Sequence, residues 1–353
     1  MKKTPIYVLL LTAFFVLALT GCGKGASGEN GEVIVYNWGE YIDPDTITMF
    51  EEETGIKVVY DEYETNEIMY PKVEAGATAY DVLCPSDYMI QKLIENDLLQ
   101  EINFDNIPNV KNIGQQYFDQ SQEFDPENKY SIPYCFGTVG ILYNKTMVDD
   151  PVDSWSILWD EKYAGKIVMY DSVRDSMAVA LKRLGYSVNT TDDGELQEAA
   201  ETLQAQKPLV MAYMMDNAKS TMINGGAAMA VVYSGDAIFC MGENEDLAYA
   251  VPKEGSNVWV DGVCITKSCT GENLDAAYTF LSYLCDAEVA KANSEYIGYA
   301  TPNAAALELM DDAVKADPAY NPPQDVLDRC EVYLDLGDKE AVYSRYWEQI
   351  KAN

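Results

Sequence analysis

The sequence contains no histidine, and its 24 lysines and arginines are outnumbered by 58 aspartates and glutamates. Without histidine the chain cannot use the serine–histidine–aspartate or cysteine–histidine forms of nucleophilic catalysis, and it lacks the usual nitrogen ligand of zinc sites. The formal net charge of −34 would repel the phosphates of a nucleic acid, so no nucleic-acid partner is expected. The same charge favours the attraction of cations.

Closely spaced cysteine pairs are also missing, because no two of the eight cysteines are separated by two residues. Seven remain apart from Cys22, an odd number, and most of them lie in apolar stretches. This pattern predicts buried free thiols, which pack as small apolar side chains, rather than a disulfide framework. A bridge between Cys264 and Cys269 stays open as an alternative. No metal site and no cofactor are expected.

Long apolar runs are rare, and the one near the N-terminus has the form of a bacterial lipoprotein signal. Its parts are Lys2, Lys3, the apolar run from Tyr7 to Leu19 and the small-residue box Leu19-Thr20-Gly21-Cys22. The run is short for a membrane span, so residues 1–21 are predicted to be a signal peptide that is removed. Cys22 would then carry the lipid, and residues 22–31 would form a flexible tether. An ordinary secretory signal with a chance cysteine is the alternative. The expected location is the cell membrane, lipid-anchored on its extracytoplasmic face.

Apolar, β-branched runs alternate with capped helical segments in the part of the chain that follows the tether. A buried strand begins at Val33, and Asp43 and Pro44 serve as the N-cap and first residue of a helix. Strands are predicted from residue 33 and at 56–60 and 80–84, and helices at 44–54, 66–75 and 89–96. This β-α-β-α-β order indicates the α/β class, with a mostly parallel sheet covered by helices on both faces.

Two longer extended runs, at residues 131–144 and 257–265, are each long enough to leave one domain and enter another. A chain of 353 residues is sufficient for two domains with complete cores. Further strands are predicted at 166–170 and 227–233, and further helices at 176–184, 194–205, 274–284, 287–294 and 339–351.

Acidic and aromatic residues follow the carboxyl ends of the predicted strands, where ligands bind in open α/β sheets. These candidate ligand-binding residues are Trp38, Gly39, Glu40, Tyr41, Ser86, Asp87, Tyr88, Asp171, Asp175, Tyr233, Asp236, Trp259 and Asp261. Carboxylates in a desolvated cleft are costly without a counter-charge, and few lysines or arginines accompany these turns. An organic cation would supply the missing charge, because carboxylates bind ammonium groups and aromatic rings cover a methylene chain.

Several of these residues have a purely structural alternative. Trp38 and Tyr41 would cap the core if they did not bind a ligand. Asp171 would cap the following turn or pair with Arg174, which is near it in the sequence. Asp236 would act as a helix N-cap.

Several stretches together resemble the spermidine/putrescine-binding proteins of bacterial ABC importers. They are YNWGEYI at 36–42, EETGIKVVYDEYETNEIMYPK at 52–72, YDVLCPSDY at 80–88, LKRLGYS at 181–187, VPKEGSNVWVD at 251–261 and IGYATPN at 297–303. The resemblance implies a type II periplasmic-binding-protein fold, in which two mixed-sheet α/β lobes are joined by a hinge and the ligand lies in the cleft between them. It implies residues 32–136 with 260–305 as lobe 1, and 137–259 with 306–353 as lobe 2.

The resemblance also implies roles for individual residues. Trp38 and Tyr41 would enclose the alkyl chain of the ligand, and Ser86 and Tyr88 would lie beside it. Asp175, with Asp171 nearby, would contact an amine. Asp261, which follows Trp259, would clamp a terminal ammonium group. Two further site residues are implied, Tyr299 before the TPN motif and Glu348 in the last helix. Tyr233, Asp236 and Asp175 mix features of different members, so the length of the ligand stays open.

The expected function is therefore the capture of a polyamine, putrescine or spermidine, and its delivery to the permease subunits of an ABC importer. The resemblance implies a monomer that binds by hinge closure and is not an enzyme. Three alternatives remain. A quaternary-amine binder would have an aromatic cage and few carboxylates, a glycosidase would use paired carboxylates, and a ferric-ion binder would use tyrosine and carboxylate oxygens.

Overall fold

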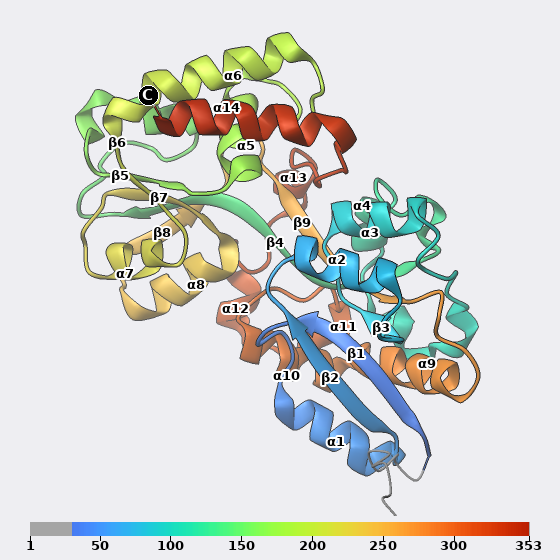
Figure 1. Ribbon diagram of the computed structural model, residues 1–353. Coiled ribbons are helices and arrows are strands. Elements are labelled where there is room, and N and C mark those ends of the chain that lie inside the picture. Colours follow the sequence, from blue (N-terminus) through green and yellow to red (C-terminus); the bar gives the residue numbers. More distant parts are fainter. Residues whose placement is uncertain (1–29, 353) are drawn as a thin grey trace, which may run out of the picture.

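The computed structural model describes residues 30–352 of the chain (Figure 1). The expected signal peptide, the lipidated Cys22 and residues 22–29 of the expected tether lie outside this range. Within it, no helix is both long enough and apolar enough to cross a membrane.

Residues 30–352 form two lobes that share one mixed sheet of nine strands, confirming the expected fold class. The order along the sheet is β2-β1-β3-β9-β4-β7-β5-β6, with β8 paired to β4. The strands are β1 Glu32–Trp38, β2 Lys57–Tyr63, β3 Val82–Leu83, β4 Ser131–Asn144, β5 Ile167–Tyr170, β6 Val210–Met214, β7 Met229–Tyr233, β8 Leu247–Ala250 and β9 Val258–Ile265.

The first lobe is built on the parallel strands β2, β1 and β3, as the alternation in the sequence predicts. Asp43 caps the helix after β1 by accepting a hydrogen bond from the amide of Asp45. That helix ends at Gly55, whose left-handed φ of 70° favours glycine. The predicted bounds of this helix and of the next one are therefore confirmed.

Two long strands, β4 and β9, connect the lobes (Figure 1). Residues 131–138 of β4 pair with β9, whereas residues 139–144 pair with β7 and β8 of the second lobe. A single strand thus belongs to both lobes, which fits the prediction that residues 131–144 and 257–265 cross between domains. Because the chain crosses as paired strands, a change in the angle between the lobes requires bending at these residues.

The helices surround the two halves of the sheet (Figure 1). They are α1 Pro44–Thr54, α2 Asn66–Ala75, α3 Asp87–Glu95, α4 Gln115–Ser121, α5 Val173–Leu184, α6 Asp193–Gln206, α7 Asn217–Ile223, α8 Ser234–Glu243, α9 Glu272–Leu284, α10 Ala287–Ile297, α11 Ala304–Leu309, α12 Asp312–Ala316, α13 Gln324–Leu327 and α14 Glu340–Ala352. The sequence prediction omits β6, β8, α4, α7, α8, α11, α12 and α13, and all of these except the ten-residue α8 have seven residues or fewer.

Each lobe has its own hydrophobic core. Phe50, Val82 and Phe280 belong to the core on one face of the first lobe's sheet, and Tyr36 and Leu83 belong to the core on the other. In the second lobe, the core joins strands β5 and β7 to α5, α6 and α14. Burying each large apolar side chain stabilises the fold by roughly 1.5–3 kcal/mol.

The C-terminal region is divided between the lobes. Met310, Tyr320 and Leu327 pack in the first-lobe core with Tyr36, although the expected division assigns residues 306–353 to lobe 2. Only from Leu336 onward do buried side chains join the second-lobe core. The reason is that the apolar side chains of the short helices α11 to α13 cover a face of the first lobe. The sequence does not show this, because it depends on three-dimensional packing.

The seven cysteines of the described range are free thiols, as predicted, and all except Cys330 are buried. Cys264 and Cys269 are not bridged.

Candidate functional site

A cleft of about 960 Å³ lies between the lobes, and residues from both line it. Thirteen of the fifteen residues predicted from the sequence lie in its wall: Trp38, Gly39, Glu40, Tyr41, Ser86, Asp87, Tyr88, Asp175, Tyr233, Asp236, Trp259, Asp261 and Tyr299. The carboxyl ends of β1, β3, β5 and β7 therefore meet in one place, as the open-sheet rule predicts. Trp259 and Asp261 do not follow a strand as predicted, because both lie inside β9, which runs antiparallel to β3 and β4.

Two predicted residues do not line the cleft. Asp171 forms an ion pair with Lys351 of α14, not with Arg174. Glu348 lies on the exposed face of α14, whose buried side is formed by Tyr343, Trp347 and Ile350. The helical period places position 348 on the solvent side, whereas Glu340, Tyr343 and Ser344 of the same helix line the cleft.

The turn after β1 forms one end of the cleft in the first lobe. Trp38 is held by a hydrogen bond from its indole Nε1 to the carbonyl of Cys84, 2.9 Å away. Glu40 follows with a left-handed φ of 56°, which turns the chain back so that Tyr41 enters the lobe. Tyr41 is buried, and its hydroxyl donates to Oδ2 of Asp261 over 2.6 Å.

Asp261 is a buried carboxylate that is only partly satisfied. Its Oδ2 accepts from Tyr41, but its Oδ1 has no hydrogen-bond partner among residues 30–352. Burial raises the pKa of Asp261 to about 6, and the hydroxyls of Tyr41 and Ser86 partly offset this effect. An unpartnered buried carboxylate oxygen is costly, so a cation at this position would stabilise the site.

Asp87 is a second buried carboxylate of the first lobe. Its Oδ1 accepts from the amide of Tyr88 over 2.8 Å, and its Oδ2 has no partner in the described part of the chain. Burial raises the pKa of Asp87 to about 8, with a further contribution from the negative charge of Asp261. The amide of Tyr88 and the guanidinium of Arg174 act in the opposite direction. Two adjacent carboxylates thus share a region with little positive charge.

Aromatic rings form the wall next to these carboxylates. The ring of Tyr299 lies edge-on to Trp259 at 5.1 Å and to Tyr41 at 6.1 Å, measured between ring centroids. Trp38 and Tyr41 are also edge-on, at 6.5 Å, and Tyr233 contacts Trp259 from the second lobe at 6.3 Å. Such a wall covers methylene groups and attracts a cation through the ring faces, with about 0.5–2 kcal/mol for each contact.

The second lobe contributes two further carboxylates, and both already have partners. Asp175 is buried and accepts hydrogen bonds from the hydroxyls of Tyr233 at 2.9 Å and Tyr333 at 3.0 Å. Asp236 accepts from the hydroxyl of Tyr170 and pairs with Lys219 at 3.1 Å. Asp236 is not the N-cap of α8, because Tyr233 occupies that position and Asp236 lies in the first turn.

Several residues that line the cleft are not predicted from the sequence. They include Asn66, Glu67, Arg174, Lys219, Glu295, Tyr296, Tyr333 and Glu340. Tyr333 and Lys219 are the most consequential, because each contacts a carboxylate from a different element. Lys219 lies on α7, which the sequence analysis does not predict, and Tyr333 follows α13 in an irregular segment. Neither has a strand-end position that marks it as a site residue.

Among residues 30–352, no group of three or more cysteines, aspartates or glutamates is placed to hold a metal ion. The arrangement instead suits an elongated organic cation, with unpartnered carboxylates at one end, hydroxyl-bonded carboxylates at the other and rings between them.

Gly235 is a second point, besides Tyr233, at which the second lobe contacts the aromatic wall. A Cβ atom at this position would lie 1.8 Å from ring atoms of Tyr299, which belongs to the first lobe. We expect Gly235→Ala to weaken ligand binding by about 1–3 kcal/mol, the usual cost of overpacking, because the lobes or the ring must move apart. Isothermal titration calorimetry would measure this loss.

Gly242 provides the matched control for this prediction. It lies in the same helix, α8, and a Cβ atom there would meet nothing within 4 Å. Gly242→Ala is therefore expected to bind ligand like the wild type. Equal affinities for the two alanine variants would show that the contact between Gly235 and Tyr299 does not affect binding.

Comparison with known proteins is consistent with this geometry. A model of the bacterial extracellular solute-binding proteins matches residues 45–322. The chain is 34% identical over its whole length to the spermidine/putrescine-binding periplasmic protein of Salmonella typhimurium, of which it covers 99%. It is 40% identical to the crystal structure of the spermidine/putrescine ABC transporter substrate-binding protein PotD of Streptococcus pneumoniae, with a TM-score of 0.84 over 91% of this chain and 98% of that one. The TpPotD lipoprotein of Treponema pallidum is 29% identical, with a TM-score of 0.79 over 91% of this chain and all of that one.

Proposed function

The chain belongs to the bacterial extracellular solute-binding protein family, and we propose that it is the component of an ABC importer that binds putrescine or spermidine. The observation that carries the proposal is the pair Asp261 and Asp87. Each has a buried carboxylate oxygen without a partner in the described chain, and both face a cleft with an aromatic wall. A polyamine matches this arrangement because its ammonium groups supply the missing charge and donors.

The proposed pose places one terminal ammonium group of the ligand at Asp261. The methylene chain would lie along Trp38, Trp259 and Tyr299. Tyr299 packs edge to face with Trp259 and with Tyr41, and Tyr41 packs in the same way with Trp38. A second amine would lie toward Asp175 in the second lobe. Glu40, which lines the same cleft, would add negative charge that attracts the ligand.

Hinge closure is the proposed mechanism. A ligand stabilises the closed arrangement only through contacts with both lobes, and the cleft offers such contacts. We propose that the crossings lie at residues 136–139, at 257–260 and at 330–336, where the pairing of β4, the pairing of β9 and the core packing change from one lobe to the other. This places residues 306–329 with the first lobe and revises the division expected from the sequence.

We further propose that Cys22 is lipidated and that residues 22–31 tether the domain to the extracytoplasmic face of the membrane. The support is the cleavage box in the sequence and the similarity to a relative described as a lipoprotein. The protein would act as a monomer that passes its ligand to the permease subunits and has no catalytic role. Labelling with radioactive palmitate in a bacterial host should mark the wild type and not Cys22→Ala.

Intrinsic tryptophan fluorescence tests the proposed ligand class. Of the five tryptophans, Trp38 and Trp259 line the cleft, whereas the other three pack with the second-lobe core. We expect putrescine or spermidine to change the emission with saturation at micromolar concentration or below, and choline and glycine betaine to have no effect. The change should disappear in the Trp38→Phe/Trp259→Phe variant and persist in Trp159→Phe. A folded domain that responds to no polyamine would contradict the proposal, and a response to choline would favour a quaternary-amine binder.

A further inference from the structure

The segment between α13 and α14, residues 331–335, is called the strap here. It leaves the first lobe after α13 and enters the second lobe before α14. The side chains of Val332 and Leu334 pack in the first-lobe core. Its polar groups, by contrast, bond mainly to the second lobe. The strap therefore contacts the first lobe through its apolar side chains and the second lobe mainly through its polar groups.

The main chain of the strap begins as a partner of β9. The amide of Glu331 donates to the carbonyl of Ser256 over 2.9 Å, and the amide of Val258 donates to the carbonyl of Glu331 over 3.0 Å. The side-chain amide of Asn257 donates to the same carbonyl over 3.1 Å. These bonds fix the first residue of the strap at the crossing strand.

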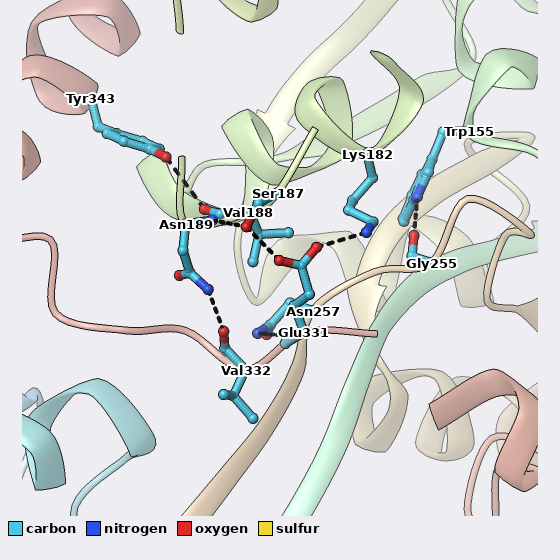
Figure 2. Close-up of polar contacts among 10 residues, drawn as sticks. All are labelled: Trp155, Lys182, Ser187, Val188, Asn189, Gly255, Asn257, Glu331, Val332 and Tyr343. Carbon is cyan, nitrogen blue, oxygen red and sulfur yellow. Dashed lines mark hydrogen bonds and ion pairs between the residues drawn. The ribbon is translucent and has the colours of Figure 1, made fainter. Parts of the chain in front are cut away.

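The side chain of Glu331 is bonded to α5 and the loop that follows it (Figure 2). Its carboxylate accepts from Nζ of Lys182 at 2.8 Å and from the hydroxyl of Ser187. The side chain of Lys182 is only 12% exposed, so this ion pair is better shielded from solvent than an ordinary surface pair.

Asn189 makes the largest number of side-chain bonds to the strap. Its Nδ2 donates to the carbonyl of Val332 over 2.8 Å, a bond that Figure 2 shows. Its Oδ1 accepts from the amide of Leu334 at 3.0 Å and from the guanidinium of Arg174 at 2.9 Å. Arg174 in turn donates to the carbonyl of Leu334 over 3.2 Å. One asparagine side chain thus bonds the residues on both sides of Tyr333.

Tyr333 is the strap residue that reaches the cleft. Its hydroxyl donates to Oδ1 of Asp175, and its ring lies 4.4 Å from the guanidinium carbon of Arg174. The ring is buried against Ala178 and Val188 of the second lobe. Asn189 and Glu331 do not line the cleft, so any influence they have on a bound ligand must pass through Tyr333 or Arg174.

We propose that Asn189 is a positioning residue for ligand binding, which holds the strap so that the Tyr333 hydroxyl stays on Asp175. This inference rests on the proposed function, since it concerns the second-lobe end of the same polyamine site. The ion pair between Lys182 and Glu331 holds the first residue of the strap, two positions before Tyr333, and so supports the same geometry. Without these bonds the Tyr333 hydroxyl is held only by Asp175 and by the packing of its ring, so part of the ligand's binding energy is spent on ordering the strap.

A double-mutant cycle between Asn189 and Tyr333 tests the inference. Asn189→Ala is expected to raise the putrescine or spermidine Kd about tenfold, on the scale of one or two lost hydrogen bonds. In the Tyr333→Phe background, the same replacement is expected to change Kd by less than about twofold, because the hydroxyl it positions is already gone. Equal losses in the two backgrounds would overturn the proposal and indicate an effect through Arg174 or through the fold in general.

Asn224→Ala is the matched control. Asn224 also bonds a main-chain carbonyl, that of Ser220 at 2.7 Å, in the same lobe but outside the cleft. Its Kd should equal that of the wild type.

Hydrogen exchange measured by mass spectrometry separates this proposal from the proposed function. In the ligand-free protein, a peptide that contains the strap should exchange faster in Asn189→Ala than in the wild type, because the Leu334 amide loses its acceptor. Unchanged exchange would overturn the positioning role whatever the ligand. If the wild type binds no polyamine and the strap still loosens, the proposed function fails while the anchoring by Asn189 stands.

Discussion

Replacing Asp261 by asparagine is expected to weaken polyamine binding by about 2–5 kcal/mol, the scale for removing one partner of a buried charge pair. The side chain has a single hydrogen bond, from Tyr41 to Oδ2, and its other oxygen has no partner in the described chain. An asparagine keeps an oxygen that can accept from Tyr41, so the fold should remain intact. What is lost is the negative charge that a bound ammonium group requires.

The measurement is the Kd for putrescine and spermidine by calorimetry, with thermal unfolding of the ligand-free variant as the check on folding. Glu348→Gln is the matched control. It removes the same charge from an exposed position outside the cleft, so it should bind like the wild type. Wild-type affinity in Asp261→Asn would remove Asp261 from the site, and a loss in Glu348→Gln would show that Glu348 does contribute to binding.

Polyamine affinity is also expected to rise with pH, by roughly a hundredfold between pH 6 and pH 8. The pKa of Asp87 lies at about 8 in the free protein, and that of Asp261 at about 6, mainly because both carboxyl groups are buried. At pH 6 nearly all molecules carry a proton on Asp87, and about half carry one on Asp261. An ammonium group favours the ionised forms, so binding releases these protons, whereas the ligand amines stay charged throughout this range.

Ionisation of Asp87 and Asp261 also affects the stability of the ligand-free protein. For both groups the folded-state pKa is raised above the value of about 3.9 expected in the unfolded chain. Their contribution to the free energy of unfolding is therefore present at about pH 4 and is lost as the pH rises toward 8. The ligand compensates for this loss, so the stabilisation that a polyamine provides should be greater at pH 8 than at pH 6.

Calorimetry in buffers with different ionisation enthalpies would count the protons released. Asp87→Asn is the informative variant, because only the weaker dependence of Asp261 should remain, about twofold between pH 6 and pH 8. An affinity that does not change between pH 6 and pH 8 in the wild type would show that binding releases no proton from Asp87 and would contradict this prediction.

Local sequence accounts for most of the regular elements that carry the site. Helices α1 and α2 have the predicted bounds because their caps, Asp43 and Thr65, are followed by left-handed glycines at the other end. Strand β4 has the predicted bounds because fourteen successive residues are extended and almost all are buried. The short β6 and β8 are missed, because strands of four or five half-buried residues have no clear period.

Sequence determined by itself the class of the protein and most of its cleft. Strand-end position was sufficient for ten of the thirteen cleft residues, because parallel strands bring their carboxyl ends together however the helices pack. Trp259 and Asp261 lie inside the antiparallel β9, and Tyr299 was implied only by the family resemblance. The same rule failed for Asp171, whose side chain reaches Lys351 of the last helix instead of the cleft.

Only the tertiary structure decided which carboxylates have counter-charges and which do not. Few basic residues lie beside the acidic turns in the sequence. In the structure, Lys219 reaches Asp236 from another helix, whereas Asp261 and Asp87 each keep an unpartnered oxygen in the described chain. It also decided that residues 310–327 cover the first lobe and that the strap brings Tyr333 to Asp175. These features depend on contacts between residues that are separated by 17 to about 280 positions in the sequence. The packing of whole elements determines such contacts, and no local period or cap in the sequence indicates them.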